Sequence, residues 1–537
     1  MTIEIYDCTL REGEQAAGAR FSLEDRLELV KRLDEFGVDY LELGWPVVSE
    51  EILKSFRMAN KTVRKARIVA FGSTSVSKSP SEDKNLDSII KSGVEYACIF
   101  GKSNIEHIKK QLKLTPGENL ERIRKSVEFL KERGVKVFYD AEHYFDGYGE
   151  DPEYALETII VAARAGAERI ILCDTNGGII PDEAKRTVKK TRERLEESSV
   201  NSKLGVHFHD DCGLALANTL SCLPHIKMIQ GTINGMGERV GNLNFSEFIP
   251  VYTNKLGNKL DIDLNKLKVL NEEAYRLSGV EMPESRAFVG NSAFAHKGGV
   301  HIDATNKGAS YEHMNPEDVG NKRIILLNTL GGSAGIINVA SQFGYLLDKK
   351  NLEVQKKVNS LFEELGELEK RGYRIGAMNA EQCLFVEKYF GDWKEFFEVE
   401  RWRVETGKEN GKEESEISIK FRINGNSVEE RLRIDGGPVD AAYKTISRLL
   451  EKEYPKVKEL KLVDFHVGIA RSRREESSVR TVITFRDGEE FETAGVDSNI
   501  IQSAIEALTK GFRYYLNKVY KLNLQNTNEG EQEKKNV

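Results

Sequence analysis

Two histidines, His207 and His209, flank Phe208 in the run GVHFHDD. If this run is a β-strand, its period of two points both imidazoles to the same face of the sheet. Two imidazoles at a strand end can share a divalent metal ion, and one carboxylate would complete a site with positions open for substrate. A hydrogen-bonded polar pair explains an isolated HxH motif equally well, so the metal interpretation needs a carboxylate from elsewhere in the chain.

The opening stretch IEIYDCTLREGEQ offers such a carboxylate. Alternating apolar residues from Ile3 predict a first strand, and Asp7 and Glu12 lie at or beyond its C-terminal end. Arg11 stands beside Glu12, where a fixed guanidinium could stabilise negative charge next to a metal. A salt bridge at the end of a strand is the alternative interpretation of this pair.

Repeated strand and helix patterns connect these two motifs in one predicted domain. Helical periodicity fills the gaps between short apolar runs, for instance after Ser22 and Asp25, which make a suitable N-terminal cap. Eight strand and helix units in roughly 250 residues predict a (β/α)8 TIM barrel. The candidate strands are 3–8, 38–45, 67–72, 95–101, 135–140, 169–174, 204–209 and 228–234.

A doubly wound open sheet fits the same alternation of strands and helices. Polar residues decide between the two folds, because they follow nearly every candidate strand, as Glu42, Lys102 and Glu142 do. An open sheet gathers such groups near one switch point, whereas a barrel brings eight strand ends to one mouth. We therefore predict the barrel, with its chemistry at the mouth.

The remainder of the chain changes pattern twice. Helices dominate after the barrel, and two βββα repeats follow, which together predict a C-terminal α+β domain. A polar end segment predicts disorder. The expected organisation is a catalytic barrel over 1–262, helical linker subdomains over 263–390 that contribute to the active site, a regulatory and dimerisation domain over 391–524 and a disordered tail over 525–537.

The composition excludes some classes of function. Among 537 residues, 79 Lys and Arg are interleaved with 86 Asp and Glu, for a formal net charge of -7. Because the basic residues form no stripe, we expect no nucleic-acid or membrane partner. The six cysteines form no CxxC pair, and the chain has no secretory leader pattern and no apolar run of about 18 residues. These features predict a cytoplasmic protein.

Several separated motifs resemble one family in the same order along the chain. They are CTLREGEQ, DAEHYFDGY, LCDTNGG, GVHFHDDCGLALAN, QGTINGMGERVGN, SAFAHKGGVH and DGGPVDAAY. Together they resemble the metal-dependent TIM-barrel enzymes that carry out Claisen condensations of acetyl-CoA, the 2-isopropylmalate, homocitrate and citramalate synthases. The central motifs are most similar to the citramalate branch. One departure is Glu12, since relatives commonly have Asp there and Glu is familiar from homocitrate synthases.

The resemblance implies a role for each matching residue. A divalent ion (Mn²⁺, Mg²⁺, Co²⁺ or Zn²⁺) would be bound by Glu12, His207, His209 and Asn242. Catalysis would fall to Arg11, Glu142, His301 and Tyr311, of which the last two would be brought over the barrel mouth to abstract the acetyl proton. The keto acid would contact Thr175 and Gln15. An amino-acid effector would bind at Gly437, Pro438, Val439, Asp440 and Ala441.

The activity implied is that of an acyltransferase in amino-acid biosynthesis, which condenses acetyl-CoA with an α-keto acid and hydrolyses the thioester. Pyruvate is the expected acceptor, isoleucine the expected inhibitor and a homodimer the expected assembly. Homocitrate and isopropylmalate synthesis, with 2-oxoglutarate and 2-ketoisovalerate as acceptors, are the nearest alternatives. A lyase or carboxyltransferase on the same barrel is less favoured, since the triplet Ala377-Met378-Asn379 lacks the Lys of biotin-dependent members. A non-catalytic amino-acid sensor is the third class.

Overall fold

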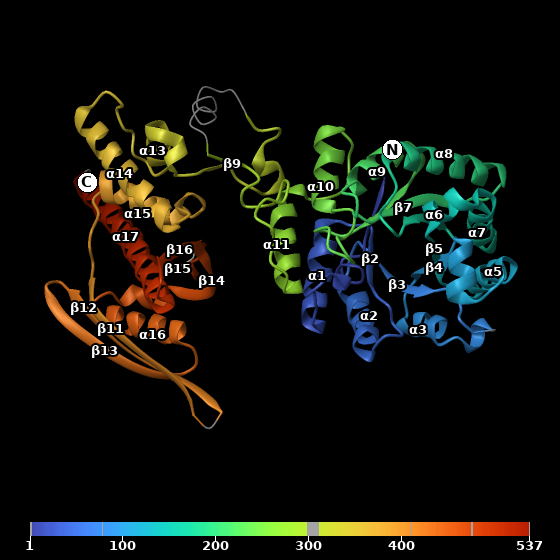
Figure 1. Ribbon diagram of the computed structural model, residues 1–537, viewed down its shortest axis with the longest axis horizontal. Coiled ribbons are helices and arrows are strands. Elements are labelled where there is room, and N and C mark those ends of the chain that lie inside the picture. The colour runs from blue at the N-terminus through green and yellow to red at the C-terminus, as the bar shows by residue number, and fades with distance from the viewer. Residues whose placement is uncertain (1–2, 78, 298–310, 410, 474–475, 536–537) are drawn as a thin grey trace. The chain divides into compact units, whose positions relative to one another are not determined.

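The computed structural model describes residues 3–77, 79–297, 311–409, 411–473 and 476–535. The chain forms two compact units, which are described separately (Figure 1). One unit comprises Met1–Phe294 and Met314–Lys322, and the other comprises Ala295–His313 and Arg323–Val537. No helix among the described residues is long and apolar enough to cross a membrane.

The first unit is a closed barrel of eight parallel strands, which confirms the predicted fold. Each strand pairs with its neighbour in chain order, and β1 pairs with β8 to close the ring. The bounds are β1 Glu4–Asp7, β2 Tyr40–Gly44, β3 Arg67–Ser73, β4 Tyr96–Lys102, β5 Lys136–Glu142, β6 Arg169–Asp174, β7 Lys203–Phe208 and β8 Met228–Gly231.

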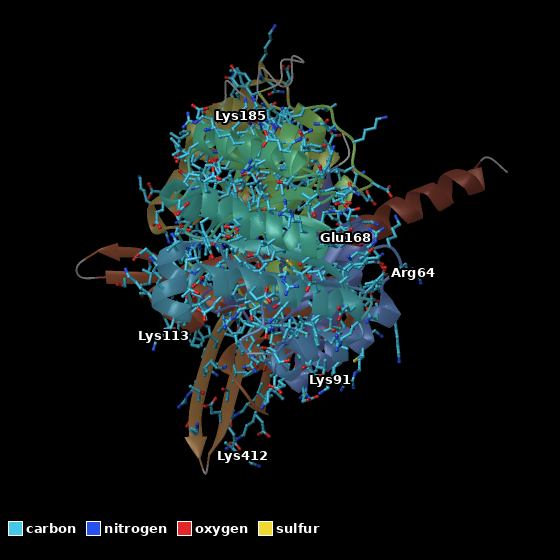
Figure 2. All side chains as sticks on the ribbon, turned by 90° about the vertical axis from the view of Figure 1, so that its right-hand side faces the viewer. Arg64, Lys91, Lys113, Glu168, Lys185 and Lys412 are labelled. Atoms are coloured by element: carbon cyan, nitrogen blue, oxygen red, sulfur yellow. The ribbon has the colours of Figure 1, made fainter. Side chains whose placement is uncertain are left out.

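Amphipathic helices surround this barrel. Helix α1 (Leu23–Phe36) starts at the capping box predicted from Ser22 and Asp25 and ends at Gly37, whose left-handed backbone favours glycine. The other helices of this unit are α2 Glu50–Thr62, α3 Lys84–Ser92, α4 Ile105–His107, α5 Pro116–Glu132, α6 Tyr144–Glu150, α7 Pro152–Ala165, α8 Pro181–Glu197, α9 Ala215–Cys222, α10 Phe245–Pro250 and α11 Leu267–Ser278. Exposed basic side chains, such as Arg64, Lys91, Lys113 and Lys185, are scattered over this unit (Figure 2).

Helix α11 extends the barrel unit beyond residue 262. Its apolar residues Leu267, Leu270 and Ala274 are buried in the same hydrophobic core as the barrel strands and helices. Burial of one helix face against the barrel stabilises this segment more than its intrinsic helix propensity would. The helical region after the barrel therefore begins with a helix that is part of the barrel unit.

Aromatic side chains fill the interior of the barrel near the start of several strands. Tyr40 packs edge-on against Tyr96 and Phe138, with ring centroids 5.4 and 5.1 Å apart, and Tyr6 stacks on Tyr40 at 6.1 Å. Such pairs add to the stabilisation from burial alone. Because these rings occupy the interior at the N-terminal ends of the strands, polar side chains can gather at the opposite, C-terminal ends.

One buried carboxyl at a strand end predicts a pH dependence of stability. Asp7 accepts hydrogen bonds from the backbone N–H of Thr9 (3.0 Å) and from its hydroxyl (2.9 Å), yet burial raises the pKa of Asp7 to about 7. An unfolded Asp titrates near pH 3.9, so between about pH 4 and 7 the folded chain keeps a proton that the unfolded chain has lost. The contribution of Asp7 to the free energy of unfolding should thus fall as pH rises through this window.

The Asp7→Asn variant isolates this effect because it cannot titrate. We expect the unfolding free energy of the wild type minus that of Asp7→Asn to fall by up to about 1.4 kcal/mol per pH unit in that window. Urea unfolding of both proteins at about pH 5, 6 and 7 measures the difference. A difference that does not change with pH would contradict the prediction.

The second unit contains helices and two antiparallel sheets. The sheets β11-β12-β13 and β14-β15-β16 are each followed by a helix, α16 and α17, which confirms the two predicted βββα units. Helix α17 includes most of the segment for which the sequence suggested a disordered tail. The bounds are β9 Ala295–His296, β10 Ile324–Ile325, α13 Gly332–Gln342, α14 Leu352–Arg371, α15 Asn379–Phe390, β11 Glu398–Glu409, β12 Lys412–Ile423, β13 Asn426–Asp435, α16 Pro438–Glu451, β14 Lys461–Arg473, β15 Glu476–Arg486, β16 Glu490–Asp497 and α17 Ile500–Lys535.

Candidate active site

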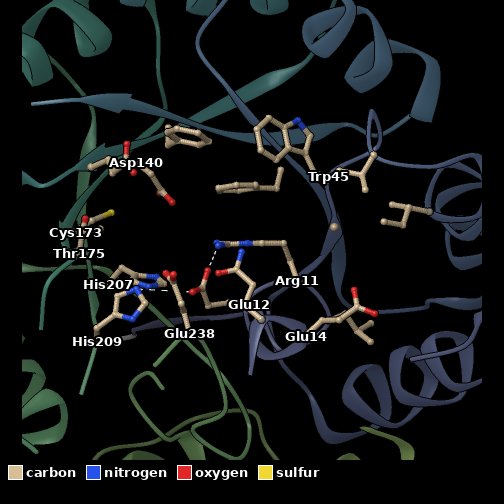
Figure 3. A pocket seen from close by; sticks show the side chains of 18 residues that line it. Arg11, Glu12, Glu14, Trp45, Asp140, Cys173, Thr175, His207, His209 and Glu238 are labelled. Atoms are coloured by element: carbon tan, nitrogen blue, oxygen red, sulfur yellow. Dashed lines mark hydrogen bonds and ion pairs between the residues drawn. The ribbon is translucent and has the colours of Figure 1, made fainter. Parts of the chain in front are cut away.

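A cavity of about 400 Å³ lies at the C-terminal ends of the barrel strands (Figure 3). Its wall combines apolar and aromatic side chains with several carboxylates, two imidazoles and one guanidinium. Ligand sites of (β/α)8 barrels lie at this end of the fold. The lining residues are Leu10, Arg11, Glu12, Glu14, Gln15, Gly44, Trp45, Val48, Ile52, Phe71, Phe100, Asp140, Glu142, Cys173, Thr175, His207, His209 and Glu238.

Arg11 is fixed on three sides at the floor of this cavity. Its Nε donates to Glu42, one terminal nitrogen donates to Glu12, and its guanidinium carbon lies 3.8 Å from the centre of the Phe71 ring. Burial opposes the charge, but the carboxylate of Glu42 outweighs this and raises the pKa of Arg11 above its usual value. Glu42 also accepts a 2.5 Å hydrogen bond from the Tyr6 hydroxyl. The guanidinium is therefore a rigid, permanent positive charge facing the cavity.

The two predicted histidines reach the same cavity from the end of β7. His207 and His209 are 5% and 6% exposed, and their ring centroids are 5.2 Å apart. Burial, followed by the charges of Arg239 and Arg11, lowers the pKa of His209 to about 4. Burial and the neighbouring His209 lower the pKa of His207 well below its usual value. Both imidazoles are therefore neutral at pH 7 and keep a lone pair available as metal ligands.

Glu12 and Asn242 supply oxygen atoms beside these imidazoles. Glu12 Oε1 lies 3.8 Å from His209 Nε2, and Asn242 forms an isolated β-bridge with His209. The Asn242 side chain is 2% exposed and lies within hydrogen-bond reach of His207. Its loop requires Gly241, where φ is +104° and an added Cβ would collide with the carbonyl oxygen of Gly235.

This donor set fits a divalent cation in its chemistry. Neutral imidazoles, a carboxylate and an amide oxygen are ligand types that Zn²⁺, Mn²⁺ or Co²⁺ accepts, and the Asn242 amide is buried beside the His207 imidazole. The described part of the chain contains no group of three His, Cys, Asp or Glu side chains converging closely enough to hold an ion. Glu12 instead pairs with Arg11.

The residues expected to contact the keto acid also line the cavity. Thr175 follows β6, and its hydroxyl accepts a 2.8 Å hydrogen bond from the backbone N–H of His143. Gln15 is exposed at the rim. Glu142 ends β5, where one carboxylate oxygen pairs with Lys102 Nζ at 2.7 Å. The structure thus brings Glu142 and Thr175 to the same cavity as Arg11.

Two of the predicted catalytic residues belong to the helical region. His301 is outside the described residues. Tyr311 belongs to the second unit and is 53% exposed. Their proposed roles in proton abstraction stay predictions.

The suggested effector segment lies at the start of α16. Gly437 is the N-terminal cap residue, and Pro438 is the first residue of the helix. Val439 and Ala441 are buried in the core of the C-terminal domain, while Asp440 pairs with Lys444. An effector at this point would therefore meet the exposed backbone of Gly437 rather than the two buried apolar side chains. Effector binding here stays a prediction.

Sequence reasoning did not assign several residues of the cavity. Trp45, Phe71 and Phe100 form an aromatic wall, with ring centroids 5.5 to 5.9 Å apart. Their signal in the sequence was an aromatic residue at the end of three candidate strands, which equally indicates core packing. Asp140, 4% exposed, opens the motif DAEHYFDGY, but the sequence assigned a role only to Glu142 of that motif.

Three family models match consecutive parts of the chain. The HMGL-like model matches residues 2–273, the homocitrate synthase post-HMGL domain-like model matches 288–367, and the LeuA allosteric (dimerisation) domain model matches 380–516. The first of these covers the barrel and its cavity. The other two match the helical region and the two βββα units.

Relatives with the same printed name align with nearly the whole chain. An (R)-citramalate synthase of Aquifex aeolicus is 39% identical over 96% of this chain and 98% of its own length. Those of Sulfolobus acidocaldarius and Geobacter sulfurreducens are 38% and 37% identical, again over 96% of this chain and over 97% and 98% of their own lengths. The chain therefore belongs to the HMGL-like family, in the branch of the (R)-citramalate synthases.

Proposed function

We propose that this chain is an acyltransferase that condenses acetyl-CoA with pyruvate and hydrolyses the thioester, giving (R)-citramalate and CoA. Full-length similarity to (R)-citramalate synthases supports the reaction. The observation that carries the chemistry is the convergence of Arg11, His207, His209 and Glu12 on one buried cavity at the barrel mouth.

A divalent cation belongs in this proposal as the cofactor. His207, His209, Glu12 and Asn242 would hold it, and Mn²⁺, Mg²⁺, Co²⁺ and Zn²⁺ are the candidates. When bound, such an ion supplies a Lewis acid that polarises the oxygens of a keto acid. The neutral state of both imidazoles means that they bind a cation at pH 7 without first losing a proton.

Arg11 stabilises the negative charge that grows on the keto oxygen as the new carbon–carbon bond forms. Its fixed position matters, because donors that are oriented before the reaction cost no reorganisation during it. Glu42 and the Phe71 ring hold the guanidinium in place. Thr175 and Gln15 would orient the carboxylate of the acceptor from the rim of the same cavity.

The proton of the acetyl methyl group requires a base. We assign this step to His301 and Tyr311, assisted by Glu142 at the end of β5. The Lys102 ammonium, 2.7 Å from Glu142, fixes the direction of that carboxylate. A base positioned within hydrogen-bond reach of the methyl group would yield the enolate nucleophile.

The charges of the cavity favour pyruvate over 2-oxoglutarate. Four glutamates line it, Glu12, Glu14, Glu142 and Glu238, together with Asp140, whose pKa burial raises to about 7. Arg11 is the cationic residue among the described lining residues, and it already pairs with Glu12 and Glu42. A second carboxylate on the acceptor would therefore enter an acidic environment without a free counter-charge, at a cost in binding free energy.

Release of CoA, measured in parallel with pyruvate, 2-ketoisovalerate and 2-oxoglutarate, tests this function. We expect kcat/KM for pyruvate to exceed that for either alternative by at least about 10-fold, the scale on which pocket contacts discriminate small substituents. Omission of the keto acid from the assay gives the background hydrolysis of acetyl-CoA. A preference for another acceptor would contradict the proposal.

The second unit would regulate this activity. Its similarity to the LeuA allosteric (dimerisation) domain supports a homodimer and an amino-acid effector, which we take to be isoleucine. Sedimentation of the full chain tests the dimer, and CoA release with added isoleucine tests the effector. We place the enzyme in the cytoplasm, in keeping with cysteines that form no disulfide in the described part of the chain.

A further inference from the structure

A buried glutamine joins His207 to the interior of the barrel. Gln230 lies on β8 directly opposite His207 on β7 and is 1% exposed. Its Oε1 is 2.9 Å from His207 Nδ1, and its Nε2 is 3.0 Å from Asp140 Oδ1. Cys98 donates from its thiol to the same Asp140 oxygen at 3.0 Å. Gln230 and Asp140 are the first residues of the motifs QGTINGMGERVGN and DAEHYFDGY, but neither was assigned a role from the sequence.

The direction of these hydrogen bonds follows from the groups involved. The amide nitrogen of a glutamine can only donate. Burial raises the pKa of Asp140 to about 7, but Asp140 Oδ1 already accepts from the Cys98 thiol, so this oxygen is an acceptor and Gln230 turns Nε2 toward it. Gln230 Oε1 must then face His207, where it can only accept. The hydrogen between them therefore belongs to His207 Nδ1, and the lone pair of the neutral ring is on Nε2.

We propose that Gln230, oriented by Asp140, is a positioning residue that fixes the His207 imidazole as its Nδ1–H tautomer and so presents Nε2 to the cavity as a cation ligand. The inference rests on the proposed function, since it concerns the same cation. Hydrogen-bond partners of ligating histidines commonly fix the tautomer and ring orientation, and their loss typically lowers metal affinity about 10- to 100-fold. In many proteins this partner is a carboxylate or backbone carbonyl, whereas here it is an amide held by a carboxylate one step further away.

Three variants test this series of hydrogen bonds. Gln230→Met keeps the length of the side chain but removes both hydrogen bonds. Gln230→Glu still accepts from His207 but places two carboxylates side by side, and adding Asp140→Asn restores a donor to the new glutamate. We expect Gln230→Met to weaken Mn²⁺ binding to the full chain about 10- to 100-fold, and the double variant Gln230→Glu/Asp140→Asn to bind more tightly than Gln230→Glu alone.

Mn²⁺ binding by titration calorimetry without substrates measures these affinities, and thermal unfolding checks that each variant is folded. If Gln230→Met unfolds, the comparison of Gln230→Glu with the double variant decides the matter. Nitrogen-15 shifts of labelled histidine in the cation-free protein report the tautomer of His207 directly. Two results would overturn this inference and leave the proposed function intact. One is a folded Gln230→Met variant that binds Mn²⁺ as tightly as the wild type does, and the other is an Nε2–H tautomer of His207 in the wild type. Failure of the wild type itself to bind Mn²⁺ would overturn the cation site on which both depend.

Discussion

Replacement of Arg11 by Lys is expected to lower kcat for CoA release about 100- to 1,000-fold, with a smaller change in KM for pyruvate. The effect on kcat reflects about 2.7–4 kcal/mol of transition-state stabilisation, the usual loss when one oriented donor to a developing oxyanion is removed. Lysine keeps the charge but cannot donate to Glu42 and Glu12 at once while facing the keto oxygen, as the planar guanidinium does. Steady-state kinetics of CoA release separates the two parameters.

Arg169→Lys provides the matched control. Arg169 likewise donates from two nitrogens to carboxylate oxygens, here both of Glu4, at 2.8 Å each, but it lies at the beginning of β6, at the opposite end of the strands from the cavity. Loss of this pair should lower stability and leave kcat near the wild-type value. If Arg11→Lys retained full kcat, or if both variants lost it equally, Arg11 would have no specific role in stabilising the alkoxide.

The barrel could be predicted from the sequence because its signal is periodic and repeated. Eight apolar runs, each followed by polar residues, correspond to the eight observed strands. The two histidines could be predicted as neighbours for the same reason, since alternation along a strand fixes the face on which His207 and His209 lie. These inferences use only positions close together in the chain.

Contacts between distant strands could not be predicted in this way. Gln230 and Asp140 lie 90 residues apart on β8 and β5, and although each begins a quoted motif, nothing in the sequence pairs one with the other. Glu42 was visible as a polar residue at a strand end, but its pairing with Arg11 depends on the register of β1 against β2. Closure of the barrel brings these groups together, and sequence spacing carries no record of that closure.

The assignment of α11 to a domain shows a second limit of prediction from the sequence. A change from strand-rich to helix-rich pattern near residue 262 predicts the start of a separate region, yet α11 buries Leu270 and Ala274 in the barrel core. Amphipathic periodicity identifies the buried face of a helix but does not identify the domain against which that face packs. Assignment of such a helix requires the tertiary contacts.

Substitution of His209 by Ala is expected to lower kcat about 1,000-fold or more and to abolish tight Mn²⁺ binding. Loss of a Lewis acid removes several kcal/mol of transition-state stabilisation, and each 1.36 kcal/mol is a factor of ten in rate. His209 is suited to this role because its pKa of about 4 keeps the ring neutral above that pH, so protons compete with the cation only in acid. Protonation of His209 should therefore not weaken binding of the cation to the wild-type protein between about pH 8 and 6.

His225→Ala is the control for this variant, because His225 lies in the short turn Leu223–His225 and does not line the cavity. Calorimetric titration with Mn²⁺ and CoA release should both be near wild type for His225→Ala and both lost for His209→Ala. The joint loss matters, since a defect in folding would also lower activity but would shift the thermal unfolding of the variant. If His209→Ala bound Mn²⁺ normally and remained inactive, the imidazole would act on the substrate itself, and the cation would have to be held by His207, Glu12 and Asn242 without it.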